Sequence, residues 1–269
     1  MMSALSAPAP KDLPMTLSFS LDRTIDIRAR RTTVFRFFTD PVRFARWWGE
    51  GSTIDPVVGG AVRIRYPEGT TASGVIQELV VDQRIVFSYG YDDPTKSIPA
   101  GGSRVTITVE EVAEGTRVKL HHEVADAKIR DEHVQGWRYV LALFANVVSA
   151  EADVGSRDAI AAWFTAWNEP STERVRELLA PIVSPNISFR DPHACVSGFE
   201  ELISHVAACQ RFMPGIRLES RGAVRHAHGT ALVEWAAVTP DGTAAMTGTN
   251  VVRFAPDGMI SEVIGIPAA

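Results

Sequence analysis

The sequence predicts an α+β protein made of two consecutive domains, and two observations favour this fold class. The first half reads as a strand, two short helices and a run of strands, closed by one long amphipathic helix. The second half reads as three helices and a curved antiparallel sheet. Helices and hairpin-linked strands that are segregated in this way are typical of α+β folds. The predicted division is a disordered tail at 1–14, a helix-grip domain at 15–150, a linker at 151–156 and an α+β cone at 157–269.

The composition limits the classes of partner. The chain has 269 residues, of which 45% are hydrophobic, and a formal net charge of −5. This charge gives no attraction to a nucleic-acid backbone or an anionic membrane, so we expect neither partner. No apolar run reaches the roughly 18 residues of a membrane span. The N-terminal segment lacks the features of a signal peptide, and the two cysteines, Cys195 and Cys209, fit a reducing compartment. We therefore expect a cytoplasmic protein.

The first half has a clear order of elements. We expect a strand at 15–27 and helices at 32–38 and around 42–48. Further strands are expected at 61–66, 72–81, 84–91, 103–111 and 116–125, and a long helix at 131–149. The long helix has one apolar stripe, which includes Trp137, Leu141 and Phe144. A sheet curved around this helix either encloses a ligand cavity, with Trp137 and Phe144 as walls, or is filled by these side chains. The sequence leaves both alternatives open.

This half resembles the SRPBCC (START-like) superfamily, and within it the family related to the activator of heat-shock-protein ATPase. The resemblance rests on motifs spread over residues 17–150, namely Arg23-Thr24-Ile25, Val34-Phe35, Thr39-Asp40-Pro41, Trp47-Trp48, Val58-Gly59-Gly60, Gly74, Gly115-Thr116 and Gly136-Trp137. One departure is Arg30-Arg31 after Ala29, where the family usually has Ala-Pro. The resemblance implies a helix-grip fold that binds an apolar small molecule or a chaperone partner.

The second half begins with a helix on which Ile160, Trp163, Phe164 and Trp167 share one face. Further helices are expected at 172–179 and 199–212, with a strand at 186–191 between them. Strands at 215–227, 230–239, 244–255 and 259–266 close the chain, separated by turns that contain glycine. No period links the two halves, so the sequence predicts two different domains.

One strand of this half carries a carboxylate in an unusual position. Ile187, Phe189 and Asp191 fall on one face of the strand, and this face is apolar until it reaches Asp191. A carboxylate held in an apolar cone can take a proton from a carbon next to a carbonyl group. The alternative is that Asp191 forms an Asx-turn with the backbone beyond Pro192.

Other polar residues are candidates for the same cavity. Asn250 lies on the face of its strand that is expected to point inward. Its amide could donate a hydrogen bond to a substrate oxygen, or could make a buried hydrogen bond within the protein instead. His193 and His226 are candidate proton carriers. His226 and His228 have the spacing of metal-ligating histidines. However, they lie at a turn, and the sequence shows no third metal ligand at a matching position. We therefore predict no metal and no cofactor.

The second half resembles the nuclear transport factor 2-like superfamily, in the SnoaL-like group that includes ketosteroid isomerases. The resemblance covers about 156–267, and its strongest motifs are Asp191-Pro192 and Ser197-Gly198. In ketosteroid isomerases, an Asp-Pro at this place supplies the general base. Trp163 and Asn250 stand where those enzymes have their two oxyanion donors, a tyrosine and a protonated aspartate. Both are departures from the family pattern.

These observations lead to two classes of function. The first is a cofactor-independent isomerase, cyclase or hydratase with Asp191 as the base, Asn250 as the oxygen polariser and His193 beside them. The expected walls of its pocket are Trp163, Trp167, Phe189, Phe212, His226 and Trp235. The second is a non-catalytic ligand-binding or stress- and chaperone-linked regulatory protein. From the resemblance we also expect homodimerisation through the sheet of the second half.

Overall fold

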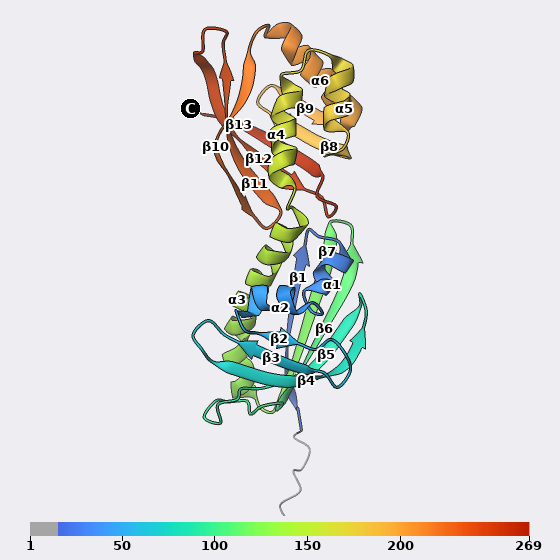
Figure 1. Cartoon of the computed structure of the whole chain (residues 1–269), viewed down its shortest axis with the longest axis vertical. Coiled ribbons are helices and arrows are strands. Elements are labelled where there is room, and N and C mark those ends of the chain that lie inside the picture. The colour runs from blue at the N-terminus through green and yellow to red at the C-terminus, as the bar shows by residue number, and fades with distance from the viewer. Residues whose placement is uncertain (1–15, 269) are drawn as a thin grey trace, which may run out of the picture.

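A computed structural model of the chain describes residues 16–268, which form two units stacked along the long axis (Figure 1). The tail predicted at 1–14, and Met15 as the start of the first strand, lie outside the described residues. The α+β fold class is confirmed in both units. None of the helices within 16–268 has the length and apolar character needed to cross a bilayer.

The first unit contains a seven-stranded antiparallel sheet, in the order β1-β7-β6-β5-β4-β3-β2. Its strands are β1 (Phe19–Ile27), β2 (Thr53–Ile54), β3 (Ala61–Arg65), β4 (Thr71–Val80), β5 (Arg84–Tyr89), β6 (Ser103–Val112) and β7 (Gly115–Val124). Two short helices, α1 (Arg31–Arg36) and α2 (Pro41–Trp48), follow β1. The Asp40 side chain accepts a hydrogen bond from Arg43 N at 2.9 Å and so caps the N-terminus of α2. Pro41 takes the first helical position, where proline is favoured.

The long helix α3 (Ala127–Ala152) crosses the inner face of this sheet (Figure 1). It begins four residues before the predicted start because the Asp126 side chain caps it, accepting from Ile129 N at 2.9 Å. Phe144 is fully buried in an aromatic core, 4.7 Å from the Phe38 ring centroid and 4.8 Å from that of Trp47. The solid-core alternative therefore holds for Phe144, and this side chain is not a wall of a pocket.

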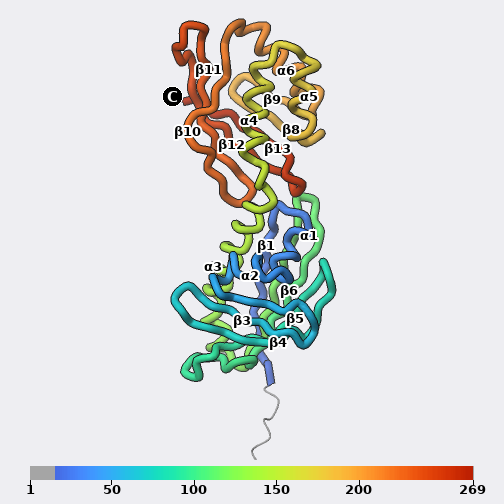
Figure 2. Tube along the Cα trace, viewed as in Figure 1, coloured from blue at the N-terminus to red at the C-terminus, as the bar shows by residue number. Residues whose placement is uncertain are grey.

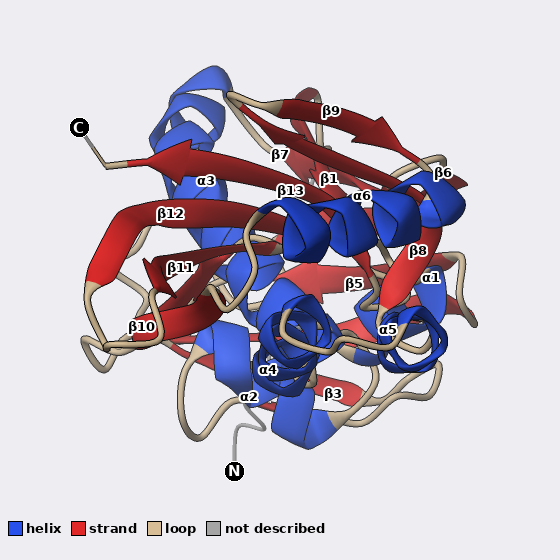
Figure 3. Cartoon of the chain, turned by 90° about the horizontal axis from the view of Figure 1, so that it is seen from above, coloured by secondary structure: helices blue, strands red, loops and turns tan. Residues whose placement is uncertain are grey.

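The second unit is a six-stranded sheet in the order β10-β11-β12-β13-β8-β9, covered on one face by three helices (Figure 3). The helices are α4 (Ser156–Trp167), α5 (Thr172–Leu179) and α6 (Phe199–Phe212). The strands are β8 (Val183–Asp191), β9 (Ala194–Ser197), β10 (Arg217–Ala227), β11 (Thr230–Val238), β12 (Ala244–Phe254) and β13 (Ile260–Pro267). β8 and β13 are parallel, whereas the sequence predicted an antiparallel sheet, because hydrophobic periodicity reports which face is buried but not strand direction.

The two units meet where α3 passes into α4 (Figure 2). The segment predicted as a polar linker contains the last turn of α3, and its Glu151 pairs with Arg43 and Arg46 on α2. Asp153 follows α3; its side chain is inaccessible and accepts a hydrogen bond from His226 Nε2 on β10 at 2.9 Å. A buried hydrogen-bonded pair thus joins the end of the first unit to the sheet of the second.

Candidate functional site

The second unit encloses an apolar cavity of about 260 Å³ between its helices and the inner face of its sheet. Tryptophan and aliphatic side chains form most of the wall, and a few polar groups interrupt it. The lining residues that carry polar chemistry are Asp191, His193, His205, Cys209, Gln210 and Asn250. An apolar pocket with a small number of convergent polar groups is the usual form of a small-molecule site.

Strand pairing brings Asp191 and Asn250 to one wall of this cavity. Asn250 on β12 pairs with Gly265 on β13, and Asp191 on β8 lies beside the same glycine. A Cβ atom placed on Gly265 would lie 3.3 Å from Asp191 Cβ and 3.4 Å from Asn250 Oδ1. The missing side chain at Gly265 therefore leaves open the space between the carboxylate and the amide. Both side chains line the cavity. Their strands, β8 and β12, lie on either side of β13, so the two backbones are about 10 Å apart.

Asp191 is held by its own turn. The residue is half-buried at the end of β8, and its Oδ1 accepts a hydrogen bond from His193 N at 2.7 Å. This contact is the Asx-turn that the sequence offered as an alternative to a role in the pocket. It occupies one carboxylate oxygen and leaves Oδ2 without a hydrogen-bond partner among residues 16–268. The turn and a position in the cavity wall are therefore compatible.

Asn250 is a buried amide, with 6% of its surface exposed. Within the described part of the chain its side chain has no hydrogen-bond partner, so the predicted alternative of a structural hydrogen bond is not realised there. Buried polar groups normally have a hydrogen-bond partner. An amide that has none in the protein therefore has an N–H donor available for a ligand.

Three indole groups add further donors. The Nε1 atoms of Trp163, Trp167 and Trp235 are buried and have no hydrogen-bond partner among the described residues. All three tryptophans line the cavity. Trp163 and Trp167 also pack on Phe189, with ring centroids 6.1 Å and 5.4 Å from that of the phenylalanine. The wall therefore combines apolar area with unpaired N–H groups, which is suited to a flat ligand that carries an oxygen.

Two further residues of the cavity come from α6. His205 was not singled out in the sequence, and Cys209 was noted there without a role in the site. They stand one turn apart, with His205 Nε2 3.6 Å from Cys209 Sγ. Burial lowers the pKa of His205, and burial together with the nearby Asp191 charge raises the pKa of the Cys209 thiol. The thiol is therefore protonated at neutral pH and is a poor nucleophile.

Two family models match the chain. Residues 28–149 match the model described as activator of Hsp90 ATPase homolog 1-like protein, AHSA1, and residues 160–263 match the model of the SnoaL-like domain. The first part of the chain is therefore similar to AHSA1-like proteins and the second part to SnoaL-like domains, and the two units are named the AHSA1-like domain and the SnoaL-like domain after these models. This confirms both resemblances that the sequence motifs indicated. The search of curated proteins returned no match.

Solved structures match each domain separately. A putative isomerase of the SnoaL-like family from Agrobacterium tumefaciens is 26% identical, and the match covers 42% of this chain and 96% of that protein, with a TM-score of 0.40. An AHSA1-like protein from Rhizobium etli is 27% identical, and the match covers 51% of this chain and 86% of that protein, also with a TM-score of 0.40.

Some of the remaining predicted site residues line a cavity, and others do not. His193 lines the cavity of the SnoaL-like domain, and Trp137 lines a separate cavity of the AHSA1-like domain. Phe212 is not a wall, because it is 77% exposed at the end of α6. His226 is not a wall either, because its ring turns to Asp153 at the junction of the domains. Strand parity alone could not show that His226 turns away from the cavity, and it does not apply to Phe212, which lies on α6.

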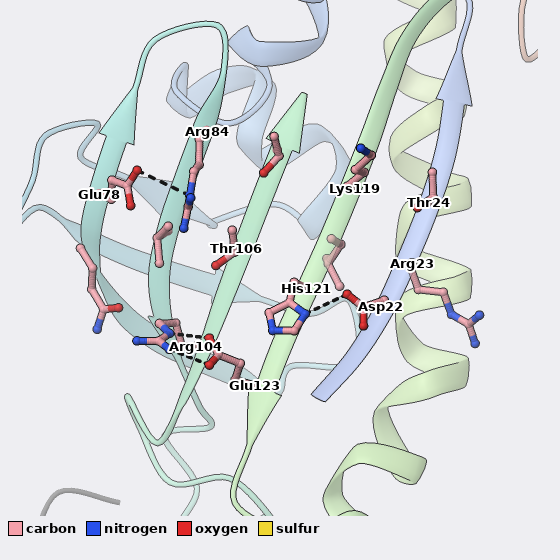
Figure 4. A pocket seen from close by; sticks show the side chains of 14 residues that line it. Asp22, Arg23, Thr24, Glu78, Arg84, Arg104, Thr106, Lys119, His121 and Glu123 are labelled. Carbon is pink, nitrogen blue, oxygen red and sulfur yellow. Dashed lines mark hydrogen bonds and ion pairs between the residues drawn. The ribbon is translucent and has the colours of Figure 1, made fainter. Parts of the chain in front are cut away.

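The outer sheet face of the AHSA1-like domain carries a different kind of surface (Figure 4). Its charged side chains pair with one another: Arg84 with Glu78, Arg104 with Glu123, and His121 with Asp22. In Figure 4 these groups lie on the face of the sheet that points away from α3. Because most of these charged groups contact one another and are open to solvent, this face is a weaker candidate for a ligand site than the apolar cavity. No cluster of three metal-ligating side chains occurs within 16–268.

Proposed function

We propose that the SnoaL-like domain is a cofactor-independent acid–base enzyme that moves a proton at a carbon next to a carbonyl group. The observation that carries this proposal is the placement of Asp191 and Asn250 on either side of Gly265 in one apolar cavity. The substrate class is a neutral, largely apolar ring ketone. The walls supply binding area, and the few polar groups would orient the single oxygen of such a substrate.

The proposed mechanism has two proton transfers. Asp191 Oδ2 takes a proton from the carbon next to the carbonyl group, and the electron pair of the C–H bond moves into an enolate. The Asn250 amide donates a hydrogen bond to the oxygen on which negative charge develops, and the indole N–H of Trp163 is a second donor. Asp191 then returns the proton to the same or another carbon. Return to another carbon gives an isomer, and no oxidant or reductant is required.

His193 lies at the edge of this arrangement. The residue is exposed, lines the cavity, and its backbone N–H is bound to Asp191 Oδ1. In the proposed mechanism its imidazole exchanges protons between the cavity and solvent.

A second candidate function is ligand binding without turnover. It is favoured by the hydrogen bond between Asp191 Oδ1 and His193 N, which gives the carboxylate a structural task. Under this alternative the cavity would bind the same class of ketone, but no proton would leave the bound molecule.

Deuterium exchange separates the two functions. In D2O, ¹H NMR measures the loss of the protons next to the carbonyl group of 2-tetralone, a two-ring ketone. The proposal predicts exchange well above the rate in buffer, and a loss of about 100-fold in Asn250→Leu, which removes the oxyanion donor. Asn186→Leu, at an exposed asparagine of the same domain, is the control. Exchange no faster than in buffer, for 2-tetralone and for the smaller cyclohexanone, would leave ligand binding as the function.

A further inference from the structure

The cavity of the SnoaL-like domain has a second polar wall, on the side of its helices. Asp191 and Asn250 lie on strands of the sheet, whereas His205 lines the same cavity from α6. The helices cover this face of the sheet (Figure 3), so a ligand between the two layers meets His205 on the side away from the strands. The proton transfers proposed above do not involve this histidine.

Aromatic neighbours hold the His205 ring. Its centroid lies 5.3 Å from that of Phe189, with the ring planes at 38°, and 5.7 Å from that of Trp167, with the planes at 78°. Phe189 is buried on the inner face of β8, two residues before Asp191. His205 therefore stands over the strand that carries the proposed base. A side chain packed in this way keeps its hydrogen-bonding atoms in fixed directions, as a specific binding site requires.

One ring nitrogen of His205 has a partner and the other does not. Nε2 lies 3.6 Å from Cys209 Sγ, a distance that suits a hydrogen bond to sulfur. Nδ1 has no hydrogen-bond partner among residues 16–268, and it is not fully buried. This nitrogen therefore keeps accessible surface on a side chain that lines the cavity.

The other polar side chains that α6 contributes to the wall are engaged. Gln210 Nε2 donates to Trp167 O at 3.1 Å and to Glu169 O at 2.6 Å, which uses both N–H groups of its amide. The Cys209 thiol contacts His205 and is a weak hydrogen-bonding group in either direction. Of the α6 side chains that line the cavity, His205 is thus the one with a free nitrogen.

The protonation state of His205 narrows the chemistry of the group that it can bind. Burial lowers its pKa, and the charges of Asp191 and Glu201 offset only part of this shift, so the imidazole is neutral at neutral pH. A neutral imidazole has one N–H donor and one acceptor nitrogen. The contact with the thiol is compatible with either tautomer, so Nδ1 is a donor in one and an acceptor in the other. A hydroxyl group both donates and accepts, so it can pair with Nδ1 in both tautomers.

We infer that His205 determines specificity by binding a hydroxyl group of the substrate through Nδ1, on the side of the cavity away from Asp191 and Asn250. The substrate is then a neutral ring ketone with a hydroxyl substituent. An anionic group at this place is disfavoured, because a neutral imidazole supplies no positive charge and the Asp191 carboxylate is close enough to act on it. This inference rests on the function proposed above, because it places the carbonyl oxygen of the ketone beside Asp191 and Asn250.

Calorimetry on the full chain compares ligands that differ in one substituent of similar size. The first pair is 6-hydroxy-2-tetralone and 6-methyl-2-tetralone, and the second pair has the same substituents at carbon 7. The inference predicts that in at least one pair the hydroxy ketone binds about fivefold more tightly, as expected for one hydrogen bond to a neutral group. Methyl ketones that bind as tightly as the hydroxy ketones in both pairs would overturn the inference.

Two variants test whether His205 is the partner of the hydroxyl group. His205→Phe keeps a ring between Phe189 and Trp167 but removes both nitrogens, and His205→Leu removes them with a smaller side chain. In either variant the hydroxy and methyl ketones should bind equally. His121→Phe, at a histidine of the AHSA1-like domain with a 42% exposed side chain, is the control and should keep the preference. A preference that persists in folded His205→Phe or His205→Leu would assign the hydroxyl group to another residue and overturn the inference.

The result for the proposed enzyme is read separately, because calorimetry does not require turnover. A hydroxyl preference that depends on His205, without deuterium exchange, would support this inference and contradict the proposed proton transfer. Deuterium exchange of 2-tetralone without any hydroxyl preference would overturn this inference and leave the proposed function in place.

Discussion

Asp191 and Asn250 face the same apolar cavity from β8 and β12, and the only residue between them on the sheet is Gly265. No hydrogen bond joins the carboxylate to the amide among the described residues. A ligand atom in the space above Gly265 would therefore contact both groups. The arrangement depends on the glycine as much as on the two polar side chains.

Gly265→Ala tests this dependence. The new methyl group would lie 3.3 Å from Asp191 Cβ, so the neighbouring side chains must move by a few tenths of an ångström. We expect affinity for 2-tetralone, measured by calorimetry, to fall at least about tenfold, with a loss of stability of about 1–2 kcal/mol from overpacking. Gly155→Ala is the control, because a Cβ there meets nothing within 4 Å. Unchanged affinity in Gly265→Ala would show that the ligand does not occupy this space.

The buried imidazole of His122 predicts a pH dependence of stability in the AHSA1-like domain. Burial lowers its pKa from 6.5 to about 3, so the unfolded state binds the proton more tightly. The stabilisation from the neutral form is complete above pH 6.5 and is lost as the pH falls towards 3. At pH 4.5 the loss is about 2.5 kcal/mol, since each pKa unit corresponds to about 1.4 kcal/mol.

Urea unfolding at pH 7 and pH 4.5 measures this effect. His122→Gln keeps an acceptor for Trp137 but does not titrate, so its free energy of unfolding should change less between the two pH values. An equal change in both proteins would assign the pH dependence to other groups.

The junction between the domains predicts a second linkage, of opposite sign. Burial raises the pKa of Asp153, whereas the hydrogen bond and charge of His226 and the charge of Arg28 lower it. Asp153 Oδ1 is buried and has no partner among residues 16–268, so His226 Nε2 is the main compensation for this carboxylate. His226→Leu should therefore destabilise the chain by about 3–5 kcal/mol at pH 7.

The variant should recover part of this loss as the pH falls, because a carboxyl group whose folded pKa is raised is more stable when protonated. Adding Asp153→Asn to His226→Leu should restore stability at pH 7, since no charge is then buried. If His226→Leu is as stable as the wild-type protein, the pair does not hold the junction.

The predicted homodimer can be tested on the outer face of the second sheet. Ile266 is 53% exposed there, next to Gly265 in sequence but on the opposite face. If this face is an interface between two copies, Ile266→Glu should convert a dimer to a monomer in size-exclusion chromatography with light scattering. Val154→Glu, at an apolar residue with 84% exposure, should leave the mass unchanged. A wild-type protein that elutes as a monomer would contradict the prediction.

Much of the fold could be predicted because local patterns determine it. The predicted bounds of α5 and α6 coincide with the observed helices, since apolar periodicity runs through both and Ser171 and Gly198 mark their N-terminal ends. The strand β9 was not predicted, because its four residues are too short to show an alternation. The parallel pairing of β8 with β13 joins segments about 75 residues apart, and no local signal encodes it.

The candidate site could be predicted only in part, for the same reason. Asp191 and Asn250 were found because each interrupts an apolar strand face. Gly265 acquires its role from two strand pairings, and His205 from the packing of α6 against Phe189, with ring centroids 5.3 Å apart. Phe212 and His226 were also expected in the cavity, but Phe212 is exposed at the end of α6 and the His226 ring contacts Asp153.

The most direct test of the central claim compares binding and deuterium exchange of 2-tetralone in Asp191→Asn. Asparagine keeps an oxygen that can accept from His193 N, so the turn should survive. Asp257→Asn is the matched control, because Asp257 Oδ1 accepts from Met259 N at 3.1 Å in the same kind of turn. We predict that Asp191→Asn loses exchange at least about 100-fold, as expected for a general base, while its Kd stays within about threefold. Exchange at the wild-type rate in folded Asp191→Asn would contradict the account.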